Sequence, residues 1–376
     1  MKLAFISTVC GCRWAGTEEV WYATALKALE AGHQIAAYIH RDISAAEQIQ
    51  NLRKHGVAIH SRSTIRFSRL WPLKEKIAPS FPAGQLQNYD VLLLSLGSLL
   101  DVFYVPGLID ALQRSKTPYV LFCQFNAEGL AFTPSQRSAL RELAGNSAGC
   151  CFVSQQNLDL AERQLAMKLP AGQAIWNPVR ITLPQPLPWP QGKTIRFGCV
   201  ARLDTLWKGQ DLLLEILSKP PWPSRDWSLG FFGEGGDLEH LKNAVEFFGL
   251  ESRVEFPGYV RNLQDIWRDR HVMVLPSRGE GLPLAILEAM MCGRPTVTTD
   301  VGGNREVLQD GETGFIAEAA TPHSFGNTLE RAWVEQSRWQ EMGEAAHKQV
   351  RNIVSGDPAQ QLLNYLLEKG RGASSP

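Results

Sequence analysis

Two glutamates lie eight positions apart within residues 277–295, which read SRGEGLPLAILEAMMCGRP. The preceding apolar run, HVMVLP at residues 271–276, predicts a buried strand that leads into a Gly-rich turn. Glu280 falls in this turn. Glu288 falls in the helix that we expect to begin close to Pro283, because a proline at the first helical position loses no hydrogen bond.

The spacing decides what chemistry the two carboxylates can share. On an ideal helix, eight residues turn through about 800°, which would leave the side chains roughly 80° and ~12 Å apart. They therefore cannot share one proton or one metal ion, and they suit the two ends of a long polar ligand. The N–H groups of the turn between them would favour a phosphate or a sugar hydroxyl. An ordinary strand–turn–helix unit with two exposed acids explains the spacing equally well.

Length and composition indicate a globular protein of two domains. A chain of 376 residues can bury two cores, and its 44% hydrophobic and 20% charged residues are typical of soluble proteins. The net charge of zero favours no partner, nucleic acid included. No apolar run approaches the ~20 residues that span a bilayer and no signal peptide precedes the first strand, so we expect a cytoplasmic protein.

The first half of the chain alternates strand-like and helix-like segments. A helix is expected over residues 17–31, ending at Gly32. This alternation predicts a doubly wound parallel sheet with right-handed crossovers. The expected strands lie near residues 2–7, 33–39, 57–59, 90–95, 118–123 and 149–154.

A proline-rich stretch at residues 176–192 interrupts the alternation and is expected to be extended. The alternation then resumes, with strands expected near residues 195–200, 228–233, 253–258, 271–276 and 294–299, and the chain is expected to be helical from about residue 325. We expect an N-terminal Rossmann-like domain at 1–180, a linker at 181–193, a second domain at 194–355, and a C-terminal helix at 356–376 that packs back on the first domain.

Ligands of open α/β sheets bind beyond the carboxyl ends of the strands, and the second half places suitable residues there. Arg202 and Lys208 follow its first strand and suit a diphosphate. Later strand ends carry G-E-G at 233–235, G-Y-V at 258–260 and G-G-x-x-E at 302–306. Each fragment is weak by itself, but their succession favours a ligand site over unrelated surface residues.

A dehydrogenase-type dinucleotide fold does not fit the first half. The first loop, Ala15-Gly16-Thr17, lacks the G-x-G-x-x-G pattern, and no acid ends the second strand. Gly16 allows close backbone approach to a phosphate at a helix N-terminus, and a simple tight turn is the alternative.

The motifs of the second half together resemble those of retaining glycosyltransferases of family 4, the glycosyl transferases group 1, which have the GT-B fold. The first half resembles the family more loosely, through A-G-T-E-E from Ala15 and G-H-Q-I from Gly32. The resemblance implies two Rossmann-like doubly wound domains that face a central cleft. The matching motifs are R-x5-K-G (Arg202, Lys208), G-E-G (Gly233 to Gly235), E-x7-E (Glu280, Glu288), G-x-P (Gly293, Pro295), G-G-x-x-E (Gly302 to Glu306) and T-G-F (Thr313 to Phe315).

The resemblance implies roles for these residues in transfer of a sugar from a nucleoside-diphosphate sugar, with UDP- and GDP-sugars expected first. Arg202 and Lys208 would neutralise the diphosphate in place of a metal ion, and Glu280 would contact donor-sugar hydroxyls. Glu288 would hold the ribose. No metal or other cofactor is implied. The remaining donor-binding residues would be Gly16, Gly233, Glu234, Tyr259, Val260, Gly281, Leu282, Pro283 and Leu284.

The acceptor side departs from the family. Many relatives carry a histidine after the strand equivalent to residues 118–123, whereas this chain reads QFNAE from Gln124. Gln124 and Asn126 can donate a hydrogen bond but cannot act as bases near neutral pH. Glu18 and Glu128 are the other acceptor-side candidates, and a structural role is the alternative for each.

Two further alternatives follow from the sequence. The chain is expected to be a transferase acting on a hydroxyl of a glycan, lipid or small molecule. The alternative is another GT-B activity, such as sugar-nucleotide epimerisation, or nucleotide-sugar binding without turnover.

Residues 53–76 contain seven Lys or Arg and one acid. They indicate either a solvated loop and helix, or peripheral contact with an anionic inner membrane surface or an anionic acceptor.

Overall fold

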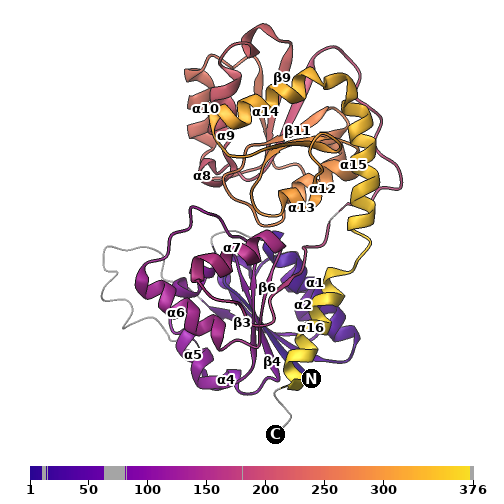
Figure 1. The fold of residues 1–376 in the computed structure, drawn as a ribbon. Helices are drawn as coiled ribbons and strands as arrows, with labels where there is room; N and C mark the ends of the chain where they lie inside the picture. Colours follow the sequence, from indigo (N-terminus) through magenta and orange to yellow (C-terminus); the bar gives the residue numbers. More distant parts are fainter. Residues whose placement is uncertain (11–13, 15, 63–80, 82, 180, 373–376) are drawn as a thin grey trace. The chain divides into compact units, whose positions relative to one another are not determined.

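The computed structural model describes residues 1–10, 14, 16–62, 81, 83–179 and 181–372 (Figure 1). The chain forms two compact units. Unit 1 comprises Met1–Pro178 and Asp357–Pro376, and unit 2 comprises Val179–Gly356. Each unit is a parallel sheet with helices packed on it, which is the Rossmann-like architecture predicted from the alternation.

Unit 1 contains a seven-stranded parallel sheet in the order β3-β2-β1-β4-β5-β6-β7. The strands β1, β4 and β5 are nearly continuous apolar runs because both faces of such a sheet are buried at its centre. Their bounds are β1 Lys2–Ser7, β2 Gln34–His40, β3 Ala58–Arg62, β4 Val91–Leu96, β5 Tyr119–Cys123, β6 Gly149–Phe152 and β7 Gln173–Ala174. The helices are α1 Glu19–Glu30, α2 Glu47–Lys54, α4 Ala83–Leu86, α5 Leu108–Ser115, α6 Pro134–Gly145, α7 Gln155–Leu165 and α16 Pro358–Gly372, with 3-10 turns η1 Gly16–Glu18, η2 Arg41–Ile43 and η3 Leu99–Tyr104.

The C-terminal helix α16 belongs to unit 1, where it packs against α1 and β4. The Thr24 hydroxyl donates to the carbonyl of Ala359 at 3.3 Å. The Tyr365 hydroxyl donates to the carbonyl of Ala171 at 2.6 Å. An ion pair between Lys27 and Asp357 at 2.7 Å joins α1 to the residue before α16.

Unit 2 contains a six-stranded parallel sheet in the order β10-β9-β8-β11-β12-β13. The strands are β8 Ile195–Val200, β9 Trp227–Phe232, β10 Val254–Gly258, β11 Val272–Leu275, β12 Thr296–Thr299 and β13 Gly314–Ala317. The helices are α8 Thr205–Lys208, α9 Gln210–Leu217, α10 Leu238–Phe247, α11 Leu263–Trp267, α12 Leu284–Met291, α13 Asn304–Val307, α14 Pro322–Val334 and α15 Trp339–Ile353, with 3-10 turns η4 Trp222–Ser224 and η5 Gln336–Arg338.

The proline-rich stretch packs against unit 2. The fully buried guanidinium of Arg294 donates to the carbonyls of Leu187 at 3.3 Å and Pro188 at 2.7 Å. The backbone N–H of Leu187 donates to the carbonyl of Cys292 at 3.2 Å. The Trp189 indole lies edge-on to His271. Residues 187–189 are therefore held to the loop before β12 rather than extended freely.

In both units the strand order reverses at the first strand, between β1 and β4 in unit 1 and between β8 and β11 in unit 2. The loops that follow two such strands diverge to opposite faces of the sheet and leave room for a ligand between them. The topology therefore points to the loops after β8 and β11 in unit 2. These are the loops that carry Arg202, Lys208 and Glu280.

Candidate active site at the carboxyl ends of β8 and β11

The centre of the site is an ion pair between Lys208 and Glu280. Lys208 Nζ lies 2.7 Å from Glu280 Oε1 and 2.8 Å from Oε2, so that the ammonium bridges both carboxylate oxygens. The side chains are 19% and 6% exposed. Lys208 ends α8 and Glu280 lies in the loop after β11, so the pair joins the two loops of the strand-order reversal.

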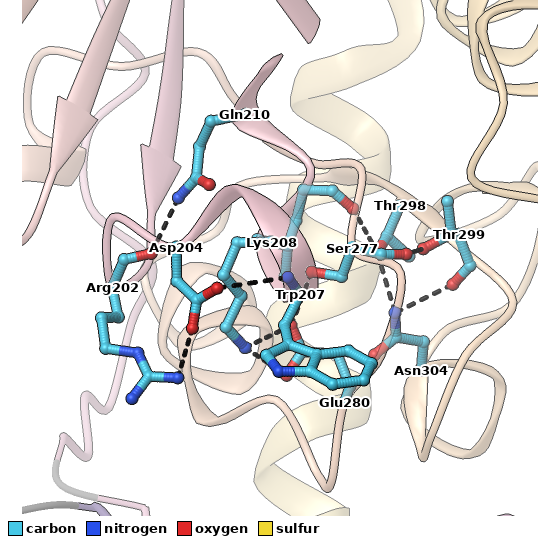
Figure 2. A network of polar contacts seen from close by, with 11 residues as sticks. Arg202, Asp204, Trp207, Lys208, Gln210, Ser277, Glu280, Thr298, Thr299 and Asn304 are labelled. Atoms are coloured by element: carbon cyan, nitrogen blue, oxygen red, sulfur yellow. Dashed lines mark hydrogen bonds and ion pairs between the residues drawn. The ribbon is translucent and has the colours of Figure 1, made fainter. Parts of the chain in front are cut away.

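A chain of polar contacts fixes the carboxylate of Glu280 (Figure 2). The buried Ser277 hydroxyl donates to Glu280 Oε1 at 2.6 Å. The carbonyl of Ser277 accepts a hydrogen bond from the Thr299 hydroxyl at 2.5 Å, and the Asn304 amide donates to the Thr299 carbonyl at 2.8 Å. Glu280 therefore accepts from Ser277, whose backbone carbonyl is in turn held by the Thr299 hydroxyl.

Arg202 lies at the edge of the same site. Its guanidinium donates to Asp204 Oδ2 at 2.5 Å, and its side chain is 66% exposed. The carbonyl of Arg202 accepts a hydrogen bond from the buried Gln210 amide at 2.8 Å. The backbone of Arg202 is thus held, while most of its side chain is exposed to solvent.

Glycines allow the loops of the site to approach one another closely. Gly209 follows Lys208 with φ +66°, and a Cβ there would lie 2.1 Å from the carbonyl oxygen of Pro276. Gly302, with φ +53°, would place a Cβ 2.4 Å from the carbonyl oxygen of Glu280. Since both neighbours are backbone atoms, any side chain would push the loops apart.

The second glutamate of the motif is also enclosed. Glu288 is 6% exposed and lies on α12, which begins at Leu284 after Pro283 as the N-cap residue. Pro283 thus precedes the helix that we expected it to open. Because Glu280 and Glu288 are both buried, the interpretation of two exposed acids is wrong.

The other expected donor-binding residues of unit 2 fall into two groups. Gly281, Leu282 and Pro283 are buried and Leu284 is half-buried, directly after Glu280. The Gly233 N–H donates to the carbonyl of Gly258 at 2.9 Å and the Leu203 N–H donates to the carbonyl of Glu234 at 3.0 Å, so the G-E-G turn joins the loops after β8 and β10. Tyr259 is 64% exposed and Val260 is half-buried.

The expected sites of unit 1 are more enclosed than their assigned role suggests. Gly16 opens η1, and Glu18 at its end is fully buried. Burial raises the pKa of the Glu18 carboxyl to about 7, against the opposing effects of Ser7, Trp21 and Arg62. The helix expected from residue 17 begins as α1 at Glu19, after this 3-10 turn.

The residues after β5 form a buried amide cluster. Gln124 and Asn126 are 4% and 2% exposed, and the Asn177 amide donates to Gln124 Oε1 at 2.8 Å. Asn126 Oδ1 accepts a hydrogen bond from the N–H of Ala127 at 3.0 Å. Glu128 differs, because its side chain is 73% exposed and pairs with Arg163 at 2.8 Å.

The basic stretch at residues 53–76 lies mostly outside the described residues. Arg53 and Lys54 end α2, and Arg62 ends β3. Arg62 donates to the carbonyl of Ser7 at 2.6 Å, and burial lowers the pKa of its guanidinium. Arg62 is therefore directed to the interior of unit 1. Arg66, Arg69, Lys74 and Lys76 lie outside the described residues.

Sequence reasoning missed several residues that build the site. Ser277 stands three positions before Glu280, and the Asp211 and Arg278 side chains are joined by two hydrogen bonds of 2.8 and 2.9 Å. Asp237 Oδ2 accepts from both the N–H and the hydroxyl of Thr205 at 2.7 Å. Ser277, three positions before Glu280, could have been identified from the sequence as a hydrogen-bond donor to it. Asp211 and Asp237 could not have been identified in this way, because their partners are 67 and 32 positions away in the sequence.

No cluster of three or more His, Cys, Asp or Glu side chains in the described part of the chain is arranged to hold a metal ion. None of the described helices combines the length and the apolar character needed to cross a membrane.

Residues 194–334 match the family model described as glycosyl transferases group 1. This segment, less than half of the chain, has the sequence pattern of a glycosyl transferases group 1 domain. The chain is similar to mannosylfructose-phosphate synthase of Agrobacterium fabrum, 34% identical over 170 residues that cover 42% of this chain and 37% of that protein. It is also similar to N-acetyl-alpha-D-glucosaminyl L-malate synthase of Bacillus anthracis, 31% identical over 33% of each chain. The alignments span only 13–39% of the lengths of the curated relatives.

Solved structures resemble the group 1 domain and the rest of the chain together. Anabaena Alr3699/HepE, solved in complex with UDP and glucose, has a TM-score of 0.71 at 17% identity, over 98% of this chain and 100% of that one. Sucrose-phosphate synthase from Thermosynechococcus elongatus has a TM-score of 0.74 at 16% identity, over 99% and 100%. Two Rossmann-like units and these neighbours confirm the predicted GT-B fold class.

Proposed function

We propose that this protein is a retaining, metal-independent glycosyltransferase that transfers a sugar from a nucleoside-diphosphate sugar to a hydroxyl acceptor. The observation that carries the proposal is the pair between the partly buried Lys208 and the buried Glu280 at the strand-order reversal of the group 1 domain, with the exposed side chain of Arg202 beside it. Cations and a hydrogen-bond acceptor at one point suit a ligand that joins a diphosphate to a hydroxyl-rich sugar.

In the proposed reaction the bond between the anomeric carbon and the diphosphate breaks, and a bond from the anomeric carbon to the acceptor oxygen forms. Negative charge grows on the leaving diphosphate, and Arg202 and Lys208 stabilise that charge in the transition state. Glu280, paired with Lys208 and fixed by Ser277, accepts hydrogen bonds from sugar hydroxyls. The acceptor oxygen attacks the anomeric carbon from the face that the diphosphate leaves, which retains the anomeric configuration. The proton of the acceptor hydroxyl passes to the leaving phosphate.

Two further residues of unit 2, Glu288 and Tyr259, complete the proposed donor site. Glu288 would bind the ribose, and the exposed Tyr259 would contact the base. Relatives of the domain are named as transferases and synthases, and a structural neighbour was solved with UDP and glucose, which supports a nucleotide-sugar donor. Nothing in these names favours an epimerase.

The test is incubation of the purified chain with UDP-, GDP- and ADP-sugars and a panel of hydroxyl acceptors, followed by NMR of the product's anomeric proton. We expect a glycoside with the donor's configuration, formed equally well in EDTA. Glu280→Gln should lower kcat about 10²-fold or more, by analogy with loss of a transition-state hydrogen bond. Glu368→Gln is the matched control, since the Glu368 side chain on α16 is 71% exposed. An inverted product, strict dependence on a divalent cation, or full activity in Glu280→Gln would refute the proposal.

A further inference from the structure

Lys208 lies on a helix that is too short to hold its own position. Helix α8 contains only Thr205–Lys208, and a single turn of helix has little stability in isolation. Neighbouring loops must therefore fix where the Lys208 ammonium points. The first anchor is local, since Asp204 caps the helix, and the second is Asp237, which accepts from the N–H and the hydroxyl of Thr205.

The third anchor is Arg278, which comes from the loop that also carries Glu280. Its guanidinium donates to the carbonyl of Thr205 at 2.6 Å. Its backbone N–H donates to the carbonyl of Trp207 at 2.8 Å, and the next N–H, of Gly279, reaches the same carbonyl at 3.3 Å. Three hydrogen bonds from two adjacent residues thus hold both ends of α8.

Asp211 orients Arg278 for this task. It lies at the second position of α9 and accepts two parallel hydrogen bonds from Arg278, at 2.8 and 2.9 Å. A bidentate pair fixes the plane of a guanidinium, which a lysine ammonium cannot reproduce. The side chains are 34% and 37% exposed, so the pair is placed at the surface of the site and contributes geometry more than burial energy.

We propose that Arg278, oriented by Asp211, is a positioning residue that sets the Lys208 ammonium against Glu280 and thereby against the donor diphosphate. The part that concerns the diphosphate rests on the proposed function. The part that concerns the Lys208–Glu280 pair does not, because that pair exists in the free protein.

The experiment measures the coupling between Lys208 and Glu280 from the unfolding equilibria of the wild type, Lys208→Met, Glu280→Gln and the double variant. The same cycle is repeated in the Arg278→Lys background. A purely structural role for Arg278 would lower the stability of all four proteins equally and leave the coupling unchanged. Positioning predicts that the coupling, as a ratio of unfolding constants, falls from about 30-fold to about 5-fold or less.

Arg331→Lys is the matched control. Arg331 makes the same bidentate pair with Asp310, at 2.5 and 3.0 Å and comparable exposure, but joins α14 to the loop before β13. The coupling in this background should equal that of the wild type. A coupling that survives in Arg278→Lys, or that falls as much in Arg331→Lys, overturns the positioning role.

A second measurement adds the ligand. Binding of UDP, GDP, ADP and pyrophosphate is measured by calorimetry on the wild type, Arg278→Lys, Lys208→Met and the Arg278→Lys, Lys208→Met double variant. We expect about 10-fold weaker binding in Arg278→Lys and no further loss when Lys208 is already replaced. Additive losses contradict positioning through Lys208. Absence of any binding to the wild type refutes the proposed function, while the stability cycle still decides the role of Arg278.

Discussion

Replacing Lys208 by methionine should destabilise unit 2 markedly, even without ligand. The substitution keeps the apolar stem of the side chain and leaves the 6%-exposed Glu280 carboxylate with the Ser277 hydroxyl but without its cation. Breaking a buried ion pair by removing one partner costs about 3–5 kcal/mol. Because Lys208 is 19% exposed, we take the lower end, about 3 kcal/mol.

For a unit of this size, about 3 kcal/mol corresponds to a fall of roughly 6–12 °C in Tm. The assay is urea unfolding followed by tryptophan fluorescence, with differential scanning calorimetry to assign the transition to unit 2. Lys208→Met combined with Glu280→Gln should lose less than the sum of the single variants, because it removes the stranded carboxylate. The control is Lys168→Met, whose ion pair with Glu162 involves a 92%-exposed lysine, so its loss should leave the stability nearly unchanged. If Lys208→Met unfolds within about 0.5 kcal/mol of the wild type, the Lys208–Glu280 pair does not organise the site.

Three further outcomes follow from other parts of the structure. Burial raises the pKa of Glu18 from 4.5 to about 7, so between these two pH values the folded state binds a proton that the unfolded chain has lost. The free energy of unfolding should therefore fall by about 3 kcal/mol as the pH rises through this range. Glu18→Gln should abolish that fall in denaturation curves taken between pH 4.5 and 8, and an unchanged slope would contradict the prediction. Gly209→Ala should lower the free energy of unfolding by at least about 2 kcal/mol more than Gly249→Ala. Both glycines have positive φ, but only a Cβ on Gly209 would lie 2.1 Å from a backbone oxygen. Equal losses of stability in the two variants would show that the loops can separate freely. Arg294→Met removes the side chain that donates to the carbonyls of Leu187 and Pro188, so proteolysis within residues 184–192 should accelerate. An unaltered rate of cleavage would mean that other contacts hold this stretch.

The parallel sheets were predictable because strands such as β4, β5 and β11 are apolar runs that alternate with helical segments. The strand near residues 195–200 was found at β8 with the same bounds, and that near residues 2–7 at β1. β7, with only Gln173–Ala174, and β13, with Gly314–Ala317, were not assigned as strands. β7 is too short to show a pattern, and both strands lie at a sheet edge, where β7 pairs with β6 and β13 pairs with β12.

The site was predictable as far as its residues were local in sequence. Glu280, Lys208 and Arg202 stand at strand ends, where the fold class brings them together. The ion pair between Lys208 and Glu280 was not predictable, because the two residues are 72 positions apart and their approach depends on the positive φ of Gly209. The helix N-terminus expected at Pro283 shifted by one residue, which leaves Glu288 in the second turn of α12.

The burial of the unit 1 candidates was the least predictable feature. Gln124 and Asn126 follow β5 as expected, but their amides are enclosed by Asn177 and by the carbonyl of Asn157 on α7. A polar residue after a strand is equally compatible with an open site and with a closed hydrogen-bond network. Only the packing of residues more than thirty positions away, which no local pattern encodes, decides between the two.

The central claim is that the loops after β8 and β11 bind the diphosphate of a nucleotide sugar, and calorimetric titration tests it most directly. One of UDP-, GDP- or ADP-glucose should bind the wild type saturably at one site in the presence of EDTA. Binding should weaken at least about 10-fold in Lys208→Met and remain unchanged in Lys168→Met, since one charge-assisted hydrogen bond contributes about 1.5–3 kcal/mol. No binding by any of the three nucleotide sugars, or equal affinity in Lys208→Met and the wild type, would contradict the claim.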